Sequence, residues 1–167
     1  MTKLHIVLVE PEIPQNTGNI ARTCAAINAK LHLVKPFPFD ISEKAVKRAG
    51  LDYWDKVEVV THENLQEFKD LVKNEEQAAI YLLSTKSKKC YTDVDYTGHK
   101  DIYLVFGAES RGLPEEYILE NIQNAVRIPM GENIRSLNLS NSVAIVAYEV
   151  ERQLNFANLE ETSEYFN

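Results

Sequence analysis

The sequence is poor in cysteine and carries no recognisable set of metal ligands. Its two cysteines, Cys24 and Cys90, stand far apart, and no CxxC pair occurs in the 167 residues. The four histidines form neither HExxH nor another close spacing that zinc sites use. We therefore expect neither a disulfide framework nor a bound metal ion.

Glycine is also scarce, and its positions exclude several common motifs. No two of the six glycines are separated by a single residue, so the dinucleotide fingerprint GxGxxG and the related turn of Rossmann-type methyltransferases are excluded. The phosphate-binding pattern GxxxxGK and the nucleophile elbow GxSxG do not occur either. The sequence therefore does not support two common types of nucleotide-binding site or the nucleophile site of an α/β hydrolase.

Long apolar runs are missing as well. No stretch of about 18 apolar residues would cross a membrane, and the first residues lack the apolar segment and cleavage site of a signal peptide. We expect a cytoplasmic protein with no membrane partner. The 18 Lys and Arg against 25 Asp and Glu give a formal net charge of −7, which argues mildly against non-specific binding to nucleic acid, although a local basic patch would still bind phosphates.

Short apolar runs alternate with helical patterns along the chain. The runs carry apolar residues at both parities, typical of strands buried on both faces, and lie at residues 4–9, 31–34, 57–60, 80–83, 103–106 and 125–128. Helices are indicated at 20–27, after Ser42, at 65–73 and from Pro114. We predict a single-domain α/β fold, a mostly parallel sheet flanked by helices, over residues 1–155, followed by an acidic polar tail at 156–167.

The last predicted helix, residues 139–154, has an unusual pattern. Its residues 143–147 are consecutive and apolar, which leaves that part without a polar face, as in helices buried all round. Two readings stay open. The helix is either a central core element, or it packs partly against a second copy of the chain.

Polar and glycine residues gather where predicted strands end. Gly107 directly follows the strand 103–106, and a glycine there lets backbone approach a ligand at the carboxyl edge of a parallel sheet. Residues 10–19 and 128–142 place amide and hydroxyl side chains next to helix starts, where Thr17, Ser140 and Asn141 are candidates for helix capping. Either these segments only turn the chain and cap helices, or they form a binding site together.

Three ordered motifs resemble those of a known family. Asn16-Thr-Gly-Asn19-Ile-Ala-Arg22, Phe106-Gly107-Ala-Glu109-Ser-Arg-Gly112-Leu-Pro114 and Ile128-Pro-Met followed by Arg135-Ser136-Leu-Asn138-Leu-Ser140-Asn141-Ser-Val resemble the signature motifs of the SPOUT-class RNA 2′-O-ribose methyltransferases. Within that class, the chain from Glu10-Pro-Glu-Ile-Pro through Arg48-Ala-Gly-Leu-Asp-Tyr53 to Tyr148-Glu is similar to the compact tRNA (cytidine/uridine-34-2′-O)-methyltransferases. The match covers nearly the whole chain.

The resemblance implies a C-terminal trefoil knot, a homodimer, and S-adenosylmethionine bound by the knot loops. By motif, the cofactor site should include Leu83, Gly107, Glu109, Ile128 and Ser136. Leu83 and Ile128 would enclose the adenine, while backbone groups near Gly107 and Ile128 bind its polar edge. From the residues alone, Leu83 and Ile128 read as core positions.

Catalytic roles follow from the same resemblance. The implied catalytic residues are Arg22, Ser136 and Asn138. A guanidinium stays protonated in proteins, so Arg22 is expected to position the nucleotide phosphate and stabilise negative charge rather than to take a proton. Glu109 would fix the loops, or would form a buried ion pair with Arg111 or Arg135.

The implied substrate is the wobble nucleotide of tRNA. The enzyme would bind the anticodon stem-loop and methylate the 2′-hydroxyl of cytidine or modified uridine 34 in leucine tRNAs, using Asn16, Arg22, Lys86, Lys88 and Tyr148, the last from a neighbouring subunit. Two basic clusters, one of Lys44, Lys47 and Arg48 and one of Lys86, Lys88 and Lys89, are either solvated faces or RNA contacts. Methylation of another tRNA or rRNA ribose, and a non-catalytic RNA-binding dimer of the same fold, are the alternatives.

Overall fold

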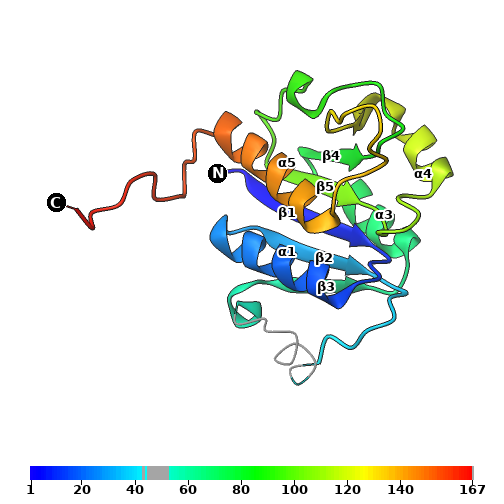
Figure 1. Cartoon of the computed structure of the whole chain (residues 1–167), viewed down its shortest axis with the longest axis horizontal. Coiled ribbons are helices and arrows are strands. Elements are labelled where there is room, and N and C mark those ends of the chain that lie inside the picture. The colour runs from blue at the N-terminus through cyan, green and yellow to red at the C-terminus, as the bar shows by residue number, and fades with distance from the viewer. Residues whose placement is uncertain (43, 45–52, 167) are drawn as a thin grey trace.

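The chain folds around one six-stranded sheet in which every pair of neighbouring strands is parallel. Figure 1 shows the computed structural model, which describes residues 1–42, 44 and 53–166. The strand order is β3-β2-β1-β5-β4-β6, with β1 at Lys3–Val9, β2 at Lys30–Val34, β3 at Val59–His62, β4 at Ala78–Leu83, β5 at Asp101–Phe106 and β6 at Ala125–Val126. The predicted α/β fold with a mostly parallel sheet is confirmed.

Helices cover both faces of this sheet. Helices α1 (Pro14–Ala26) and α5 (Leu139–Gln153) pack together on one face, and α3 (Leu65–Lys73) and α4 (Glu115–Glu120) lie on the other (Figure 1). Side chains of alternating parity in β1 serve both cores, since Ile6 packs under α1 and α5 while Val7 packs under α3 and α4. Because both faces are covered, every residue from 4 to 9 is buried.

Most predicted elements are found, with shifted boundaries. Strand β3 lies two residues later than predicted, and β6 ends at Val126 rather than at residue 128. Helix α1 begins at Pro14, so Asn16 and Thr17 belong to its first turn instead of a loop, and Pro114 is the residue before α4. The helix predicted after Ser42, with Lys47 and Arg48, lies outside the described residues.

Helix α5 supports the core-helix reading and leaves one apolar strip exposed. Val143, Val146 and Val150 are fully buried in the core of the single chain. On the other side of the helix, Ile145 is 37% exposed and Tyr148 is 45% exposed. The expectation that residues 143–147 leave no face towards solvent is therefore wrong for one chain.

The residues after α5 lead away from the folded body. Figure 1 shows this segment extending to one side, and Tyr165 and Phe166 near its end are strongly exposed. The division into residues 1–155 and a tail at 156–167 stays a prediction. No helix of the described residues is long and apolar enough to span a membrane.

Three histidines form a hydrogen-bonded chain across the sheet. His5 on β1, His32 on β2 and His62 on β3 are all buried, with 2.9 Å between His5 Nδ1 and His32 Nε2 and 2.9 Å between His32 Nδ1 and His62 Nε2. His5 Nε2 lies 2.9 Å from Asp101 Oδ1. A carboxylate only accepts, so His5 Nε2 carries the proton, and each following ring then donates from Nε2 to the ring before it. The chain is satisfied when all three rings are neutral.

Burial keeps these imidazoles neutral. Burial, with smaller contributions from the neighbouring His5 and His62, lowers the pKa of His32 to about 3. Burial also lowers the pKa of His62, and it lowers that of His5 against the opposing pull of Asp101. The unfolded chain therefore binds more protons than the folded chain once the pH falls below the ordinary histidine pKa of about 6.5.

We expect the free energy of unfolding to fall as the pH is lowered from 7 to 5. One buried neutral histidine contributes a loss of about 2 kcal/mol over this range, above the region where most carboxylates titrate. Urea unfolding at both pH values measures it. His32→Phe should be less stable at pH 7, because His5 and His62 each lose a partner, but should lose less stability towards pH 5.

His99→Gln is the matched control, because His99 lies outside the chain of three rings. Its pH dependence should equal that of the wild type. A His32→Phe protein whose stability falls as steeply between pH 7 and 5 as the wild type would contradict this account.

Candidate active site

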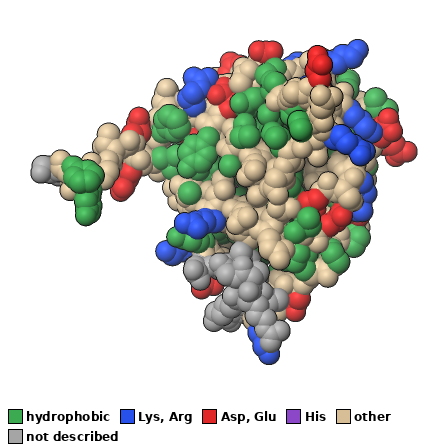
Figure 2. Space-filling view, viewed as in Figure 1, with side chains coloured by type: hydrophobic (Ala, Val, Ile, Leu, Met, Phe, Trp, Pro, Cys, Tyr) green, Lys and Arg blue, Asp and Glu red, His purple; other side chains and the backbone are tan. Residues whose placement is uncertain are grey.

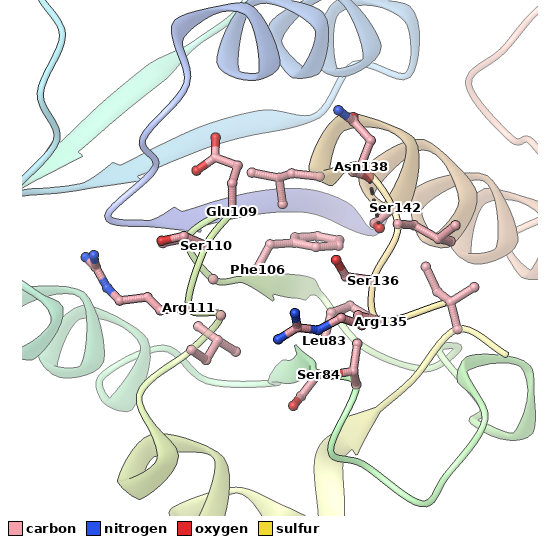
Figure 3. Close-up of a pocket in the computed structure, with 18 of the residues that line it drawn as sticks. Leu83, Ser84, Phe106, Glu109, Ser110, Arg111, Arg135, Ser136, Asn138 and Ser142 are labelled. Atoms are coloured by element: carbon pink, nitrogen blue, oxygen red, sulfur yellow. Dashed lines mark hydrogen bonds between the residues drawn. The ribbon is translucent and has the colours of Figure 1, made fainter. Parts of the chain in front are cut away.

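Three segments that are far apart in the sequence meet at the carboxyl edge of the sheet. They enclose a cavity of about 690 Å³ together with the start of α1. Residues 83–86 begin at the last residue of β4, residues 106–113 begin at the last residue of β5, and residues 135–139 lead into the first residue of α5. In Figure 3, Ser110 and Arg111 lie on one side of this space, and Arg135, Ser136, Leu83 and Ser84 lie on the other. The predicted meeting of strand exits is therefore present.

The turn after β5 is formed by backbone packed directly against Gly107. A Cβ atom on Gly107 would overlap the backbone of Gly112 and Leu113. The Gly112 amide donates to the Ala108 carbonyl at 2.8 Å, and Gly112 itself has φ +69°, a conformation that favours glycine. Both glycines are thus required by the tight loop that forms one wall of the cavity.

Glu109 binds the residues just before α1 from this loop. Its carboxylate accepts the backbone N–H of Glu12 at 2.7 Å and that of Ile13 at 3.0 Å, and it accepts from Asn16 Nδ2 at 3.3 Å. The residue before α1 is Ile13, whose side chain has no polar atom. A negative charge at a helix N-terminus is also favoured by the helix dipole. Glu109 therefore holds α1 against the β5 loop.

Asn138 extends this connection to the third segment. Its Nδ2 donates to Asn16 Oδ1 at 3.1 Å, while its Oδ1 accepts the backbone N–H of Ser140 at 2.9 Å and that of Asn141 at 3.3 Å. Asn138 is thus the N-cap of α5, and the capping role considered for Ser140 and Asn141 is wrong. Thr17 does not cap α1, and its hydroxyl finds no partner among the described residues.

Arg111 bonds to the acidic β1–α1 loop instead of to Glu109. Its guanidinium lies 3.3 Å from Glu10 and 3.7 Å from Glu12. The Ser110 hydroxyl donates to Glu12 at 2.7 Å, and this hydrogen bond holds the pKa of Glu12 below its usual value. The ion pair considered for Glu109 with Arg111 or Arg135 is not formed among the described residues.

The cavity gathers most, but not all, of the predicted site residues. Its lining includes Asn16, Leu83, Lys86, Gly107, Glu109, Ile128, Ser136 and Asn138. Arg22, Lys88 and Tyr148 are not among its described lining residues. Arg22 lies further along α1, with its guanidinium carbon 4.8 Å from the centre of the Tyr53 ring.

Several lining residues were missed by the sequence reasoning. Phe106, Met130 and Leu137 add apolar surface to the cavity, and Ser84 and Thr85 add hydroxyl groups. Phe106 ends a buried strand and reads as core, so its role depends on the loops around it. One feature of the sequence indicated that a side chain from elsewhere would bind near the start of α1. Ile13, the residue before Pro14, is apolar and leaves α1 without a capping residue of its own.

No metal centre accompanies the cavity in the part of the chain that the structure describes. Within residues 1–42, 44 and 53–166, no three His, Cys, Asp or Glu side chains are placed to hold an ion. The available chemistry is that of hydroxyl, amide and guanidinium groups around a half-apolar cavity.

A parallel sheet with such a cavity at its carboxyl edge is typical of an α/β protein that binds a small ligand there. Residues 3–148 match the family described as SpoU rRNA Methylase, and the chain belongs to that family. This membership confirms the resemblance drawn from the three motifs, and with it the expectation of a methyltransferase.

Curated relatives of nearly equal length carry one name. The tRNA (cytidine(34)-2′-O)-methyltransferase of Saccharophagus degradans is 50% identical over 155 residues, which cover 92% of this chain and 97% of the relative. A Lactococcus lactis protein that has the same name provisionally is 52% identical over 158 residues, covering 93% of this chain and 92% of its own.

Solved structures share the fold. An RNA methyltransferase of provisional assignment from Bacillus anthracis superposes with a TM-score of 0.89 at 45% identity, covering 96% of this chain and 99% of that one. A structure reported for the 2-OH methylation of C/U34 on tRNA gives 0.82 at 42% identity, covering 93% and 98%. AdoMet-bound rRNA methyltransferase from Sinorhizobium meliloti gives 0.80 at 25% identity and covers 91% of this chain and 57% of that one.

We expect Gly107→Ala to lower the free energy of unfolding by about 1–3 kcal/mol, because the added methyl group meets backbone that cannot move aside without opening the turn. Gly131→Ala is the matched control, since its Cβ would meet no atom within 4 Å, and it should change stability by less than about 0.5 kcal/mol. Thermal unfolding measures both. Equal stability of the two variants would show that the β5 turn tolerates a side chain.

Proposed function

We propose that the chain transfers the methyl group of S-adenosylmethionine to the 2′-hydroxyl of nucleotide 34, cytidine or modified uridine, in leucine tRNAs. The convergence of the three motif segments on one cavity carries this proposal. The names of full-length relatives support the choice of nucleotide 34. A cytoplasmic location, where tRNA is modified in bacteria, stays a prediction.

The cavity suits S-adenosylmethionine in size and chemistry. Its volume of about 690 Å³ lies within the roughly 300–1,000 Å³ typical of small-molecule sites. Leu83 and Ile128 offer apolar surface for the adenine, and backbone groups beside Gly107 and Ile128 are available for its polar edge. Ser136 adds a hydroxyl for the ribose or the amino-acid part. Glu109 acts here by holding the loop, since its oxygens accept from the start of α1.

We infer that the segment between β6 and α5 forms the predicted trefoil knot. Backbone hydrogen bonds support a path through the loop after β4: the Ser84 amide donates to the Val126 carbonyl at 3.0 Å, and the Arg127 amide donates to the Lys89 carbonyl at 2.8 Å. Beyond Arg127 the chain returns past the cavity to Asn138 and α5. Such a path would let the residues of the knot enclose the cofactor.

The methyl transfer itself is an in-line displacement, in which the 2′-oxygen forms a bond to the methyl carbon as the bond to sulfur breaks. S-adenosylmethionine supplies the electrophilic methyl group when bound. The chain must align the ribose behind that carbon and stabilise negative charge as the hydroxyl proton leaves to phosphate or water. Arg22 is suited to hold the nucleotide phosphate, while Ser136 and Asn138 are suited to orient the ribose and the loop before α5.

RNA contacts are proposed along the open side of the cavity. Lys86 lines it, and Lys88 lies exposed on the same loop. Asn16 stands between Glu109 and Asn138 at the inner end. Lysine charges near the cavity would attract phosphates locally although the net charge is −7.

We propose a homodimer through the face that carries α1 and α5. Ile13, Ile145 and Tyr148 are large exposed side chains on or next to these helices. Figure 2 shows this face, where hydrophobic side chains lie exposed over α5 and few charges occupy the central band. Because Arg22 and Tyr148 lie outside the cavity of their own chain, this arrangement would let them act at the site of the other subunit.

Ile145→Glu should dissociate this dimer while the chain stays folded, because Ile145 is exposed in the single chain, whereas Val146 is part of its core. Leu119→Glu on α4 is the matched control, since Leu119 is 64% exposed on the other side of the sheet. Light scattering and circular dichroism report assembly and folding. A wild-type monomer at micromolar concentration, or an Ile145→Glu dimer, would refute the interface.

The substrate is tested by mass spectrometry of RNA from cells that lack this gene. The 2′-O-methyl group at nucleotide 34 of leucine tRNAs should be missing and should return when the wild-type gene is restored. Arg22→Ala should fail to restore it, because turnover falls by about two or more orders of magnitude while calorimetry still detects S-adenosylmethionine.

Other outcomes identify the alternatives. A methyl group lost from another tRNA position or from rRNA keeps the chemistry and changes the substrate. Unchanged methylation in every RNA, with retained RNA binding, would indicate the non-catalytic dimer. If the purified wild type binds no S-adenosylmethionine in the presence of EDTA, the interpretation of the chain as a methyltransferase is wrong.

A further inference from the structure

Arg22 and Lys56 share one aromatic neighbour outside the cavity. The guanidinium carbon of Arg22 lies 4.8 Å from the centre of the Tyr53 ring, and Lys56 Nζ lies 5.5 Å from the same centre. Cations within about 6 Å of an aromatic centroid are attracted by the electrons of the ring. Tyr53 therefore brings two positive charges into one neighbourhood.

The position of Tyr53 is fixed by its sequence neighbours. Trp54 and Val57 pack against the core under α1 and α5. The backbone closes into a short 3-10 turn, η1 at Trp54–Lys56, with the Lys56 amide donating to the Tyr53 carbonyl at 3.0 Å. Two apolar anchors thus leave Tyr53 half-buried and Lys56 exposed beside α1.

Arg22 lies on the exposed side of α1, so the protein core does not restrict its side chain. The buried residues Ile20, Ala21 and Cys24 turn towards the core, and Arg22 is exposed on the other side of the helix. An arginine side chain in solvent samples many rotamers, and a stacked guanidinium has fewer of them to lose when it binds. The Tyr53 ring, whose centre lies 4.8 Å from the guanidinium carbon, gives the Arg22 side chain a fixed neighbour on the exposed side of α1.

Two positive charges near the same ring repel each other. The binding of an anion offsets this repulsion and lowers the electrostatic free energy of the pair. A guanidinium donates two parallel hydrogen bonds to a phosphate, and a nearby ammonium adds charge without demanding a fixed geometry. An RNA backbone supplies phosphates in a row, which suits two neighbouring cations.

We propose that Tyr53 is a positioning residue that holds Arg22, with Lys56 beside it, as a binding platform for the phosphates of the substrate RNA. The proposal rests on the proposed function, in which Arg22 contacts the nucleotide to be methylated. Tyr53 acts through Arg22 and does not touch the reacting atoms. Lys56 contributes to RNA affinity and not to the chemical step.

The first test compares Tyr53→Leu with Tyr53→Phe. Phenylalanine keeps the aromatic face, so kcat should stay within roughly two-fold of the wild type, whereas leucine should lower kcat roughly five-fold or more. S-adenosylmethionine affinity and thermal stability should be alike in the two variants. Equal kcat in Tyr53→Leu and the wild type overturns the positioning role.

A second readout needs no RNA. In the free protein, ring currents of Tyr53 should shift the NMR signals of the Arg22 δ protons, because the two side chains are in contact. Tyr53→Phe should keep this shift and Tyr53→Leu should lose it. Arg22 signals that are the same in the leucine variant and the wild type show that the ring does not hold the guanidinium, and overturn the proposal.

Lys56→Gln tests the second cation, with Lys73→Gln on α3, across the sheet, as the matched control. Lys56→Gln should weaken RNA binding and reduce the magnitude of the slope of log K against log salt by about one. Lys73→Gln should change neither quantity. A wild-type salt slope in Lys56→Gln overturns the platform.

These results are separable from those for the proposed function. If the wild type methylates a nucleotide other than 34, the substrate assignment falls, and the same variants are compared on the RNA that is methylated. If the wild type methylates nucleotide 34 and Tyr53→Leu is indistinguishable from it, only the platform falls. A wild type that binds no RNA overturns both.

Discussion

The site depends on one carboxylate. Glu109, on the loop after β5, accepts two backbone N–H groups at the start of α1 and the amide of Asn16, which is bonded in turn to Asn138 at the start of α5. Helix α1 begins without a polar capping residue of its own, and the two residues before it are held by a side chain from a different part of the sequence. The helix dipole favours the negative charge at that place. The three motifs are thus one hydrogen-bonded unit before any ligand binds.

The parallel sheet makes this unit possible. Strands β1, β5 and β4 are neighbours and all run in one direction, so the segments that follow them emerge at one edge. Gly107 then lets the β5 loop fold back onto its own backbone, which leaves room for the loop before α5. The same parallel arrangement aligns His5, His32 and His62 across the other face, where burial keeps them neutral. The sheet therefore positions the cavity at one edge and a chain of three buried histidines on one face.

The acidic and the basic side chains around the site have different roles. The carboxylates of Glu109, Glu10 and Glu12 hold loops and Arg111. Arg22, Lys56 and Lys86 are exposed, and they are the cations proposed to contact RNA. A formal net charge of −7 therefore says little about whether the chain binds RNA.

The sequence by itself determined the elements and the family. Apolar runs at both parities predicted buried parallel strands, and three ordered motifs identified the methyltransferase class. Both could be predicted because strand burial and loop chemistry depend on residues that are adjacent in the sequence. Only the tertiary structure decided how these parts meet. Glu109 was expected to fix the loops or to form an ion pair with an arginine, and its carboxylate accepts the N–H groups of Glu12 and Ile13, just before α1. The histidines, which have no metal-site spacing, form a hydrogen-bonded chain through the strand register, and Arg22 lies against Tyr53 outside the cavity. Such contacts join residues from different elements, so they are set by register and packing and leave no periodic signal in the chain.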